Sequence, residues 1–440
     1  AKAEGVTPGF SIRDQKGENY VIKFDPLGYP ELASGAEVVS TKLFYAMGYN
    51  TPENYVVYFN PRILKLGEKV SLTDKKGRKR YMTEEDLQIL LDGIEKLPDG
   101  RIRAMASKYL GGKPIGPFKY KGIRKDDLND FIRHEDRREL RGLRIIAAWL
   151  NHFDTKDGNS LDMFVSEKGS NFVRHYLIDF GATLGSASHG PNHLWREHQY
   201  DIDPGVLTTN ILTLGLYVRP WEKQPGVIYP SVGVFVSNLF NPMTYKPQVP
   251  NPAFQSMTMS DGFWAAKIVM SFSDKQLETI IKEGQYSNPQ AEFFLLNIIR
   301  ERRDIIGRYF FSRMTPLDNF KVDYDAERKP FLEFKDLVIT SGLQDSEATY
   351  QFHVSYLPGD GKVIEEGEIE RDTSIPLLNL QRTFFSQIKG QDKKLPAEQI
   401  HIQIRNWKPD QKSWNKPVSV YLLPDKDSRK FKIIGIKRES

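Results

Sequence analysis

Five polar residues near the middle of the chain have the types and spacing that phosphoryl transfer requires. The pattern H-x-D-x-K-x-x-N starts at His152, and the triplet Asp-Phe-Gly starts at Asp179. Asp154 offers a carboxylate to accept a hydroxyl proton, and Lys156 offers a cation to neutralise the moving phosphate. Asn159 and Asp179 offer oxygen ligands for magnesium. Because this reaction needs positioned charge more than covalent chemistry, the pattern predicts transfer of a phosphoryl group to a hydroxyl acceptor.

The elements expected around these residues can hold them at a cleft. Residues 143–150 (LRIIAAWL) form an apolar helix end that runs into the loop, and residues 161–165 form a short strand after it. Residues 175–178 (HYLI) form another strand, which delivers Asp179 at its C-terminal end. Either motif alone would be better explained by ordinary turn residues. Both motifs in this order, on these elements, favour a catalytic site.

A lysine and a glutamate near the N-terminus complete the expected set. Residues 19–24 (NYVIKF) form a strand that carries Lys23, whose ammonium group would grip the first two phosphates of a nucleotide. Residues 31–47 have helical apolar spacing and contain two candidates for the glutamate that holds this lysine. Glu31 follows a proline in the first turn, where the helix dipole alone explains an acidic residue. Glu37 is therefore the favoured partner of Lys23, and Glu31 is the alternative.

Nucleotide-binding residues are expected at two further places. Gly5 and Gly9 lie in the sequence GVTPGF, which either covers the phosphates or forms an ordinary turn, since it is not G-x-G-x-x-G. The adenine of ATP would lie against an interlobe hinge that contains Lys108, Tyr109 and Leu110 and is followed by two glycines. The sequence begins without methionine and has little chain before Gly5, so the first strand of this lobe is expected to be incomplete.

This set of residues resembles that of the protein-kinase-like superfamily, in an atypical branch comparable with the HipA, spore-coat CotH and phosphatidylinositol kinases. The resemblance covers residues 1–320 and is carried by Lys23, Glu37, Asp154, Lys156, Asn159 and Asp179. It implies a two-lobed kinase-like fold with ATP and Mg²⁺ as cofactors. The strings YVIKFDP, AAWLNHFDTKDGNSLDMFV and HYLIDFGATLGS also resemble a group of large uncharacterised bacterial proteins that are typically exported. That second resemblance implies no particular substrate.

Two departures from ordinary protein kinases bear on regulation and on the acceptor. Phe153 stands where an arginine usually precedes the catalytic aspartate, so we expect no cation there for a phosphorylated loop to neutralise. Activation by loop phosphorylation is therefore not expected. The segment after Gly181 shows no A-P-E signature, so a peptide-docking platform is not assumed. The acceptor need not be a protein.

Composition places the chain among globular proteins. Its 440 residues are 39% hydrophobic and 27% charged, which suits two to three domains. The sequence has no apolar run long enough for a membrane span, and its net charge of +5 gives no reason to expect a nucleic-acid partner. Without cysteine it has no disulfides, thiolate metal sites or cysteine nucleophiles. Together with the resemblance, this favours an exported bacterial protein (periplasmic, cell-surface or secreted), and a cytoplasmic address stays open.

Three regions are expected along the chain. Residues 1–112 form the small lobe with a polar insertion at 60–100, residues 113–318 form the large lobe, and residues 319–440 form a β-sandwich. The sandwich is indicated by about seven strands of alternating apolar residues, separated by turn sequences such as PGDG. It would brace the lobes or bind a protein or surface partner.

Helices are expected mainly in the large lobe. A charged helix is predicted over 126–150, and an irregular segment rich in proline and aromatic residues over 205–258. Three helices follow, at 261–270, 274–282 and 290–311.

The predicted fold class is α+β, with a two-lobed protein-kinase-like fold followed by a C-terminal β-sandwich domain. The predicted function is an ATP- and Mg²⁺-dependent phosphotransferase that acts on a hydroxyl acceptor. One alternative is a small-molecule or glycan kinase of the same fold. Another is an exported pseudokinase that binds or scaffolds a partner. The intact set of charged residues favours catalysis, whereas the missing glycine signature and the expected export favour the scaffold.

Overall fold

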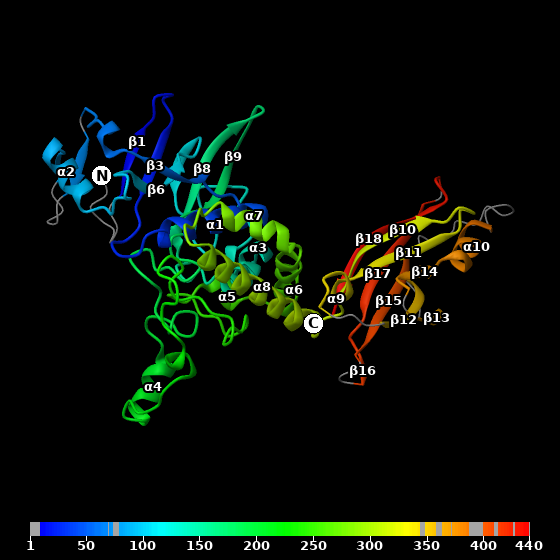
Figure 1. The fold of residues 1–440 in the computed structure, drawn as a ribbon. Coiled ribbons are helices and arrows are strands. Elements are labelled where there is room, and N and C mark those ends of the chain that lie inside the picture. Colours follow the sequence, from blue (N-terminus) through cyan, green and yellow to red (C-terminus); the bar gives the residue numbers. More distant parts are fainter. Residues whose placement is uncertain are drawn as a thin grey trace. The chain divides into compact units, whose positions relative to one another are not determined.

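The computed structural model of the chain comprises two compact units, Ala1–Ile306 and Gly307–Ser440 (Figure 1). The structure describes residues 9–68, 70–73, 79–343, 348–357, 363–370, 372–386, 399–408, 412–425 and 427–439. Each unit buries apolar side chains in a core of its own. The predicted catalytic residues all belong to the first unit.

A four-stranded antiparallel sheet opens the first unit. In spatial order its strands are β1 (Gly9–Arg13), β2 (Asn19–Lys23), β6 (Ile102–Lys108) and β3 (Asn54–Phe59). Lys23 ends β2 and pairs with a residue of β1 on one side and of β6 on the other. Its backbone is therefore fixed by two neighbouring strands.

Helix α1 (Leu32–Ala46) packs on this sheet and carries the favoured glutamate. Val38 is fully buried and belongs to a small core shared with β3 and β6. At the start of the helix, the Ser34 N–H donates to Asp25 Oδ1 at 2.7 Å, which satisfies one of the first-turn donors. Glu37 follows one turn later and is buried.

The chain between β3 and β6 forms an excursion with its own short elements. These are η1 (Pro61–Ile63), β4 (Ser71–Thr73), β5 (Lys79–Tyr81) and α2 (Glu84–Asp92). Thr83 and Asp86 form a capping box at the start of α2. Leu91 and Ile94 belong to the core of the four-stranded sheet, so the excursion is anchored at its end.

The large lobe begins with elements that surround the catalytic motif. They are β7 (Lys113–Gly116), η2 (His134–Asp136), α3 (Arg138–Trp149), η3 (Asp157–Asn159), β8 (Ser160–Glu167) and β9 (Ser170–Leu177). β7, β8 and β9 form an antiparallel sheet in that order. The catalytic motif lies between α3 and β8, and Asp179 follows β9 by two residues.

The remaining large lobe contains six helical elements joined by irregular segments. They are α4 (Pro204–Leu212), η4 (Pro220–Lys223), α5 (Pro252–Gln255), α6 (Met259–Met270), α7 (Asp274–Lys282) and α8 (Pro289–Phe311). α6 packs closely on α3. Gly142 of α3 makes this approach possible, since a Cβ there would lie only 2.7 Å from the ring of Trp264 in α6. Figure 1 shows α4 at the end of an arm that stands away from the other helices of this unit.

The second unit packs two antiparallel sheets around one core, in the manner of a β-sandwich. One sheet contains β10 (Leu317–Tyr324), β11 (Pro330–Asp336) and β14 (Ser374–Pro376). The other contains β13 (Val363–Glu370), β12 (Thr349–Leu357), β15 (Gln399–Lys408), β17 (Val418–Asp425) and β18 (Lys430–Arg438), with β16 (Ser413–Trp414) beside β15. Two short helices, α9 (Leu337–Thr340) and α10 (Leu378–Ser386), complete the unit. Apolar residues of both sheets and of α10 share the core.

The predicted fold class is confirmed, and two local expectations are wrong. A small lobe built on a sheet, a large lobe that contains helices α3 to α8 and a C-terminal β-sandwich follow in the predicted order. The helix expected over 126–150 begins only at Arg138, because Asp130 binds nearby side chains and backbone instead of continuing a helix. The irregular segment over 205–258 contains the helix α4. No helix among the described residues has both the length and the apolar character that crossing a membrane requires.

Candidate active site

A cavity of about 670 Å³ in the first unit brings distant parts of the sequence together. The predicted site residues that line it are Gly9, Lys23, Glu37, Asp154, Lys156 and Asp179. They come from β1, β2, α1, the loop after α3 and the segment after β9. A concave site with several convergent charged groups is typical of a binding or catalytic centre.

Lys23 bridges two carboxylates at the centre of this cavity. Its Nζ lies 2.8 Å from Asp179 Oδ1 and 3.3 Å from Glu37 Oε2. The side chain of Glu37 is 4% exposed, whereas that of Asp179 is 47% exposed and therefore accessible to a ligand. Glu37 thus holds the lysine from the buried side, and Asp179 meets it from the open side.

The charges of this triad are set by burial and by one another. Burial alone would lower the pKa of Lys23, but the carboxylates of Glu37 and Asp179 outweigh it and raise that pKa above its ordinary value. Burial would raise the pKa of Asp179, yet Lys23 holds it below its ordinary value. For Glu37 burial prevails, and its pKa is raised. Lys23 is therefore a cation, and Asp179 an anion, at neutral pH.

Glu37 also connects α1 to the Asp-Phe-Gly triplet. Its Oε1 accepts the backbone N–H of Phe180 at 3.0 Å and the side-chain amide of Asn54 at 3.3 Å. Glu31, the alternative candidate, instead accepts the backbone N–H of Ser287 at 3.0 Å, through Oε2. The structure therefore pairs Lys23 with Glu37, while Glu31 binds the start of α8 at a distance from the triad.

The predicted catalytic loop, residues 152–159, orders its polar side chains among themselves. Lys156 Nζ lies 2.9 Å from Asp154 Oδ1, and the Asp154 side chain is 19% exposed. Asn159 donates its amide N–H to the backbone carbonyl of Asp154 at 2.7 Å. Its amide nitrogen is committed to the loop, so the amide oxygen is the atom that could bind a cation. Asn159 does not line the cavity itself, as it is 7% exposed.

The loop rests on a buried histidine. The His152 ring packs against Phe44 of α1 and Phe180, with centroid separations of 5.7 Å and 5.5 Å. Its backbone carbonyl accepts the Tyr245 hydroxyl at 2.5 Å. Burial lowers the pKa of His152, so the ring is neutral, and its Nδ1 lies 3.4 Å from the Ala182 carbonyl. The residue supports the loop beneath Asp154.

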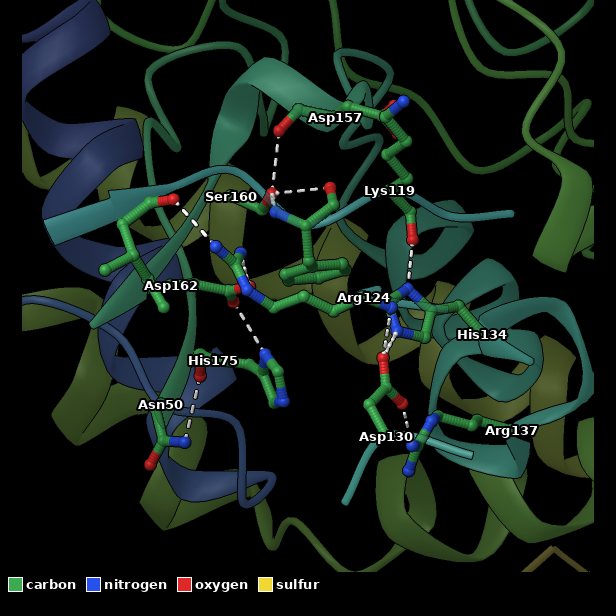
Figure 2. Close-up of polar contacts among 12 residues, drawn as sticks. Asn50, Lys119, Arg124, Asp130, His134, Arg137, Asp157, Ser160, Asp162 and His175 are labelled. Atoms are coloured by element: carbon green, nitrogen blue, oxygen red, sulfur yellow. Dashed lines mark hydrogen bonds and ion pairs between the residues drawn. The ribbon is translucent and has the colours of Figure 1, made fainter. Parts of the chain in front are cut away.

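The far end of the loop is tied to the chain that follows β7. The Ser160 hydroxyl donates to the Asp157 carbonyl at 2.7 Å, and the Tyr120 N–H donates to the Asp157 carboxylate at 3.1 Å. Beyond them, Asp162 is fully buried and binds both Arg124 at 2.8 Å and His175 at 2.6 Å (Figure 2). Because Asp162 lies on β8 and His175 on β9, this network fixes the strand that leads to Asp179.

A second polar cluster lies beside this network in Figure 2. Asp130 accepts from Arg137 at 2.6 Å and lies 2.8 Å from His134 Nε2. His134 also contacts the carbonyl of Lys119 through its other ring nitrogen. The cluster orders the chain from Lys119 to Arg137 against the start of α3, behind the catalytic loop.

The oxygen atoms of Asp179 and Asn159 fit a hard divalent cation. Carboxylate and amide oxygens are the ligands that magnesium prefers, and it commonly completes its shell with phosphate oxygens and water. The described residues contain no group of three His, Cys, Asp or Glu side chains that could hold a metal alone. A metal held by Asp179 and Asn159 would complete its shell with water and with oxygen atoms of a bound nucleotide.

Of the other residues predicted to bind the nucleotide, only Gly9 lines the cavity among those that the structure describes. Gly5 lies outside the described residues. Gly9 lines the cavity, and a Cβ there would lie 3.0 Å from a β2 carbonyl. Lys108, Tyr109 and Leu110 do not line the cavity. Lys108 pairs with Glu18, in the turn between β1 and β2, at 3.3 Å, and the Tyr109 hydroxyl forms a hydrogen bond with the Ser11 hydroxyl of β1 at 2.6 Å. Their contact with adenine stays a prediction.

The cavity also contains residues that the sequence did not indicate. They are Met105 of β6 and, on the side of the catalytic loop, Ser188, His189, Arg196 and Gln248. Arg196 lies over the Phe153 ring, 4.4 Å from its centroid. A residue 43 positions later in the chain thus places a cation beside Phe153, and Asp201 is the carboxylate that pairs with it. That activity does not require loop phosphorylation stays a prediction. Arg196 belongs to no motif of fixed spacing, so nothing in the sequence indicated its contact with Phe153.

The sequence matches no family model and no curated protein. Among solved structures, the chain is similar to the Helicobacter pylori proinflammatory kinase CtkA, at 12% identity and a TM-score of 0.34, over 71% of this chain and 93% of that one. It is also similar to the Golgi casein kinase, solved with Mn/ADP bound, at 10% identity and a TM-score of 0.30, over 70% of this chain and 71% of that one.

Proposed function

We propose that the protein is a phosphotransferase that uses Mg-ATP and a hydroxyl acceptor. The observation that carries this proposal is Lys23, bridged between Glu37 and Asp179 in the cavity that also contains Asp154. Lys23 would hold the nucleotide phosphates, and Asp179 with Asn159 would hold magnesium. Bound magnesium would neutralise charge on the phosphate oxygens. A lysine, a glutamate and the Asp179 carboxylate at one cavity match the demands of this chemistry.

The chain's own residues account for the transfer step. A bond forms between the acceptor oxygen and the terminal phosphorus, while the bond from that phosphorus to the oxygen of ADP breaks. The acceptor proton passes to the Asp154 carboxylate. Lys156, 2.9 Å from Asp154, would neutralise charge on the transferred group. The acceptor stays open between a protein and a small molecule or glycan.

Nucleotide binding is the direct test of this proposal. A ligand that binds only the folded state stabilises it, by about 1.4 kcal/mol at ten times its Kd. We expect millimolar Mg-ATP to raise the thermal midpoint of the first unit by about 2 °C. Mg²⁺ alone is the control.

Two negative results have different meanings. No midpoint shift with Mg-ATP, in a chain that is folded by circular dichroism, would overturn the kinase proposal. A shift without any phosphate release or acceptor labelling would instead favour the pseudokinase that binds nucleotide as a scaffold. The two alternatives are therefore separated by binding and turnover measured on the same sample.

A further inference from the structure

Arg196 lies between two aromatic rings at the edge of the catalytic cavity. Its guanidinium carbon is 4.4 Å from the centroid of Phe153 and 4.1 Å from that of Trp195. The side chain is 12% exposed, so most of its charge is removed from water. A guanidinium that stacks on two ring faces gains a cation–π contact with each and is restricted in orientation.

A carboxylate within the same segment neutralises this arginine. Arg196 Nη1 donates to Asp201 Oδ1 at 2.5 Å. The second oxygen of Asp201 accepts the side-chain amide of Gln248 at 2.7 Å. Because the buried guanidinium would be costly without a counter-charge, Asp201 is the group that makes the stacked arrangement stable.

Backbone hydrogen bonds close these contacts into a ring. The N–H of Gln248 donates to the carbonyl of Phe153 at 2.7 Å, and the N–H of Asp201 donates to the carbonyl of Gln248 at 2.9 Å. Phe153 is thus held through its ring by Arg196 and through its carbonyl by Gln248. The next residue in the chain is Asp154, whose side chain faces the cavity.

We propose that Arg196 and Asp201 are positioning residues, which hold the Asp154 loop in the geometry for transfer without any covalent modification. The proposal rests on the proposed function, since it assigns these residues to the same reaction. Arg196 acts through Phe153. Asp201 pairs with Arg196, in the role that a phosphate group would have in a kinase activated by phosphorylation. Without the pair, the Phe153 ring loses its stacking partner and Asp154 is free to shift. A displacement of about 1 Å can cost about 100-fold in rate.

Two variants and one matched control test this pair. Arg196→Ala removes the stacked cation, and Asp201→Asn keeps the shape while removing the charge. Arg174→Ala is the control, because Arg174 also stacks on a ring (Phe172, 5.2 Å) and pairs with a carboxylate (Glu167, 2.8 Å), but it lies on β9 away from the cavity. Each variant is measured for phosphate release from Mg-ATP, for KM of Mg-ATP and for thermal midpoint.

We expect a loss confined to turnover. Arg196→Ala should lower kcat about 10- to 100-fold, and Asp201→Asn about 3- to 10-fold, with KM for Mg-ATP changed less than about twofold. Asp201→Glu should restore part of the rate. The double variant should lose no more than Arg196→Ala alone, because the two residues act as one unit. Arg174→Ala should keep the wild-type rate.

Other outcomes overturn the inference in distinguishable ways. If wild type turns over and Asp201→Asn is folded and equally fast, the pair does not position the loop. If phosphatase treatment of wild type removes activity, a covalent phosphate does the work assigned to Asp201. If wild type neither binds nor turns over Mg-ATP, the proposed function fails first, and this inference fails with it.

Discussion

Two aspartates of the cavity differ in surroundings and therefore in expected role. Asp154 is 19% exposed and is paired with Lys156 of its own loop, whereas Asp179 is 47% exposed and is paired with Lys23 from β2. Asp179 also has a φ of 64°, a left-handed conformation that a non-glycine residue adopts at a cost. The backbone there is held in place by the Phe180 N–H bond to Glu37. Such a conformation at a ligand-facing carboxylate is typical of a functional site.

Isosteric amides at the two aspartates should fail differently. Asp154→Asn removes the proton acceptor, so we expect Mg-ATP binding to persist while phosphoryl transfer falls by about 10² to 10⁴. Asp179→Asn removes a charged ligand of magnesium, so we expect weaker binding of Mg-ATP itself. Thermal shift with Mg-ATP and phosphate release measure the two properties separately. Equal nucleotide affinity in both variants would contradict these assignments.

His152 should make the first unit less stable in mild acid. Burial lowers its pKa in the folded state, while in the unfolded chain it returns to about 6.5. Below that pH the unfolded state binds the proton that the folded state refuses, so stability is present above about pH 6.5 and is lost as pH falls. The loss approaches about 1.4 kcal/mol per pH unit until the folded state also protonates.

Urea unfolding at pH 7 and pH 5 measures this contribution. His152→Phe keeps a ring packed against Phe44 and Phe180 and removes the titration, so the variant should lose less stability than wild type over that interval. His189, an exposed histidine of the same unit, gives the control as His189→Phe. Equal losses in wild type and in His152→Phe would show that other groups cause the acid sensitivity.

At the scale of elements, regular apolar spacing predicted most of what positions the site. α6, α7 and α8 begin and end close to the predicted limits, because their apolar residues recur at helical spacing between clear caps. The helix carrying Glu37 is predicted by the same helical spacing, and the strand carrying Lys23 is predicted by its short run of strand-forming residues. Contacts between distant segments had no local signal. Arg196 reaches Phe153 only because the chain folds back, and no spacing within the sequence encodes that approach.

Two helical errors have identifiable physical causes. The chain from Asp126 to Arg137 is rich in charged residues, but Asp130 accepts the Arg124 N–H at 2.6 Å and pairs with Arg137. These side-chain bonds replace a helical turn. In α4, Asp203 caps the first turn, and Thr208 and Thr209 donate back to the helix backbone. The proline-rich composition of the surrounding segment masked this local cap.

The arm that carries α4 should contribute little to stability. None of the described side chains of α4 is buried, and Leu216 beyond it is 82% exposed. We expect Leu216→Ser to change the free energy of unfolding by less than about 0.5 kcal/mol. Leu143→Ala in α3 is the contrasting variant, since Leu143 is 1% exposed and its truncation should cost about 2 to 5 kcal/mol. Urea denaturation measures both, and a large loss in Leu216→Ser would show that the arm is buried in solution.

At the scale of the whole molecule, the candidate active site and the β-sandwich belong to separate units. The cavity, its charged triad and the closed set of contacts around Arg196 all lie within Ala1–Ile306. The core of the second unit is built from its own strands and α10, including Tyr350 and Phe334 at 1% exposure each. Its described residues contain no group of three His, Cys, Asp or Glu that could hold a metal. That this unit braces the lobes or binds a protein or surface partner stays a prediction.

Separate cores predict separate unfolding. A unit with its own buried core can unfold cooperatively by itself, so calorimetry of the full chain should show two transitions. Mg-ATP should raise the midpoint of one transition and leave the other unchanged, because the proposed nucleotide site contains only residues of the first unit. Phe334→Ala, in the sandwich core, should lower the midpoint that Mg-ATP does not move. A single transition that shifts as a whole, both with Mg-ATP and in this variant, would show that the two units unfold together.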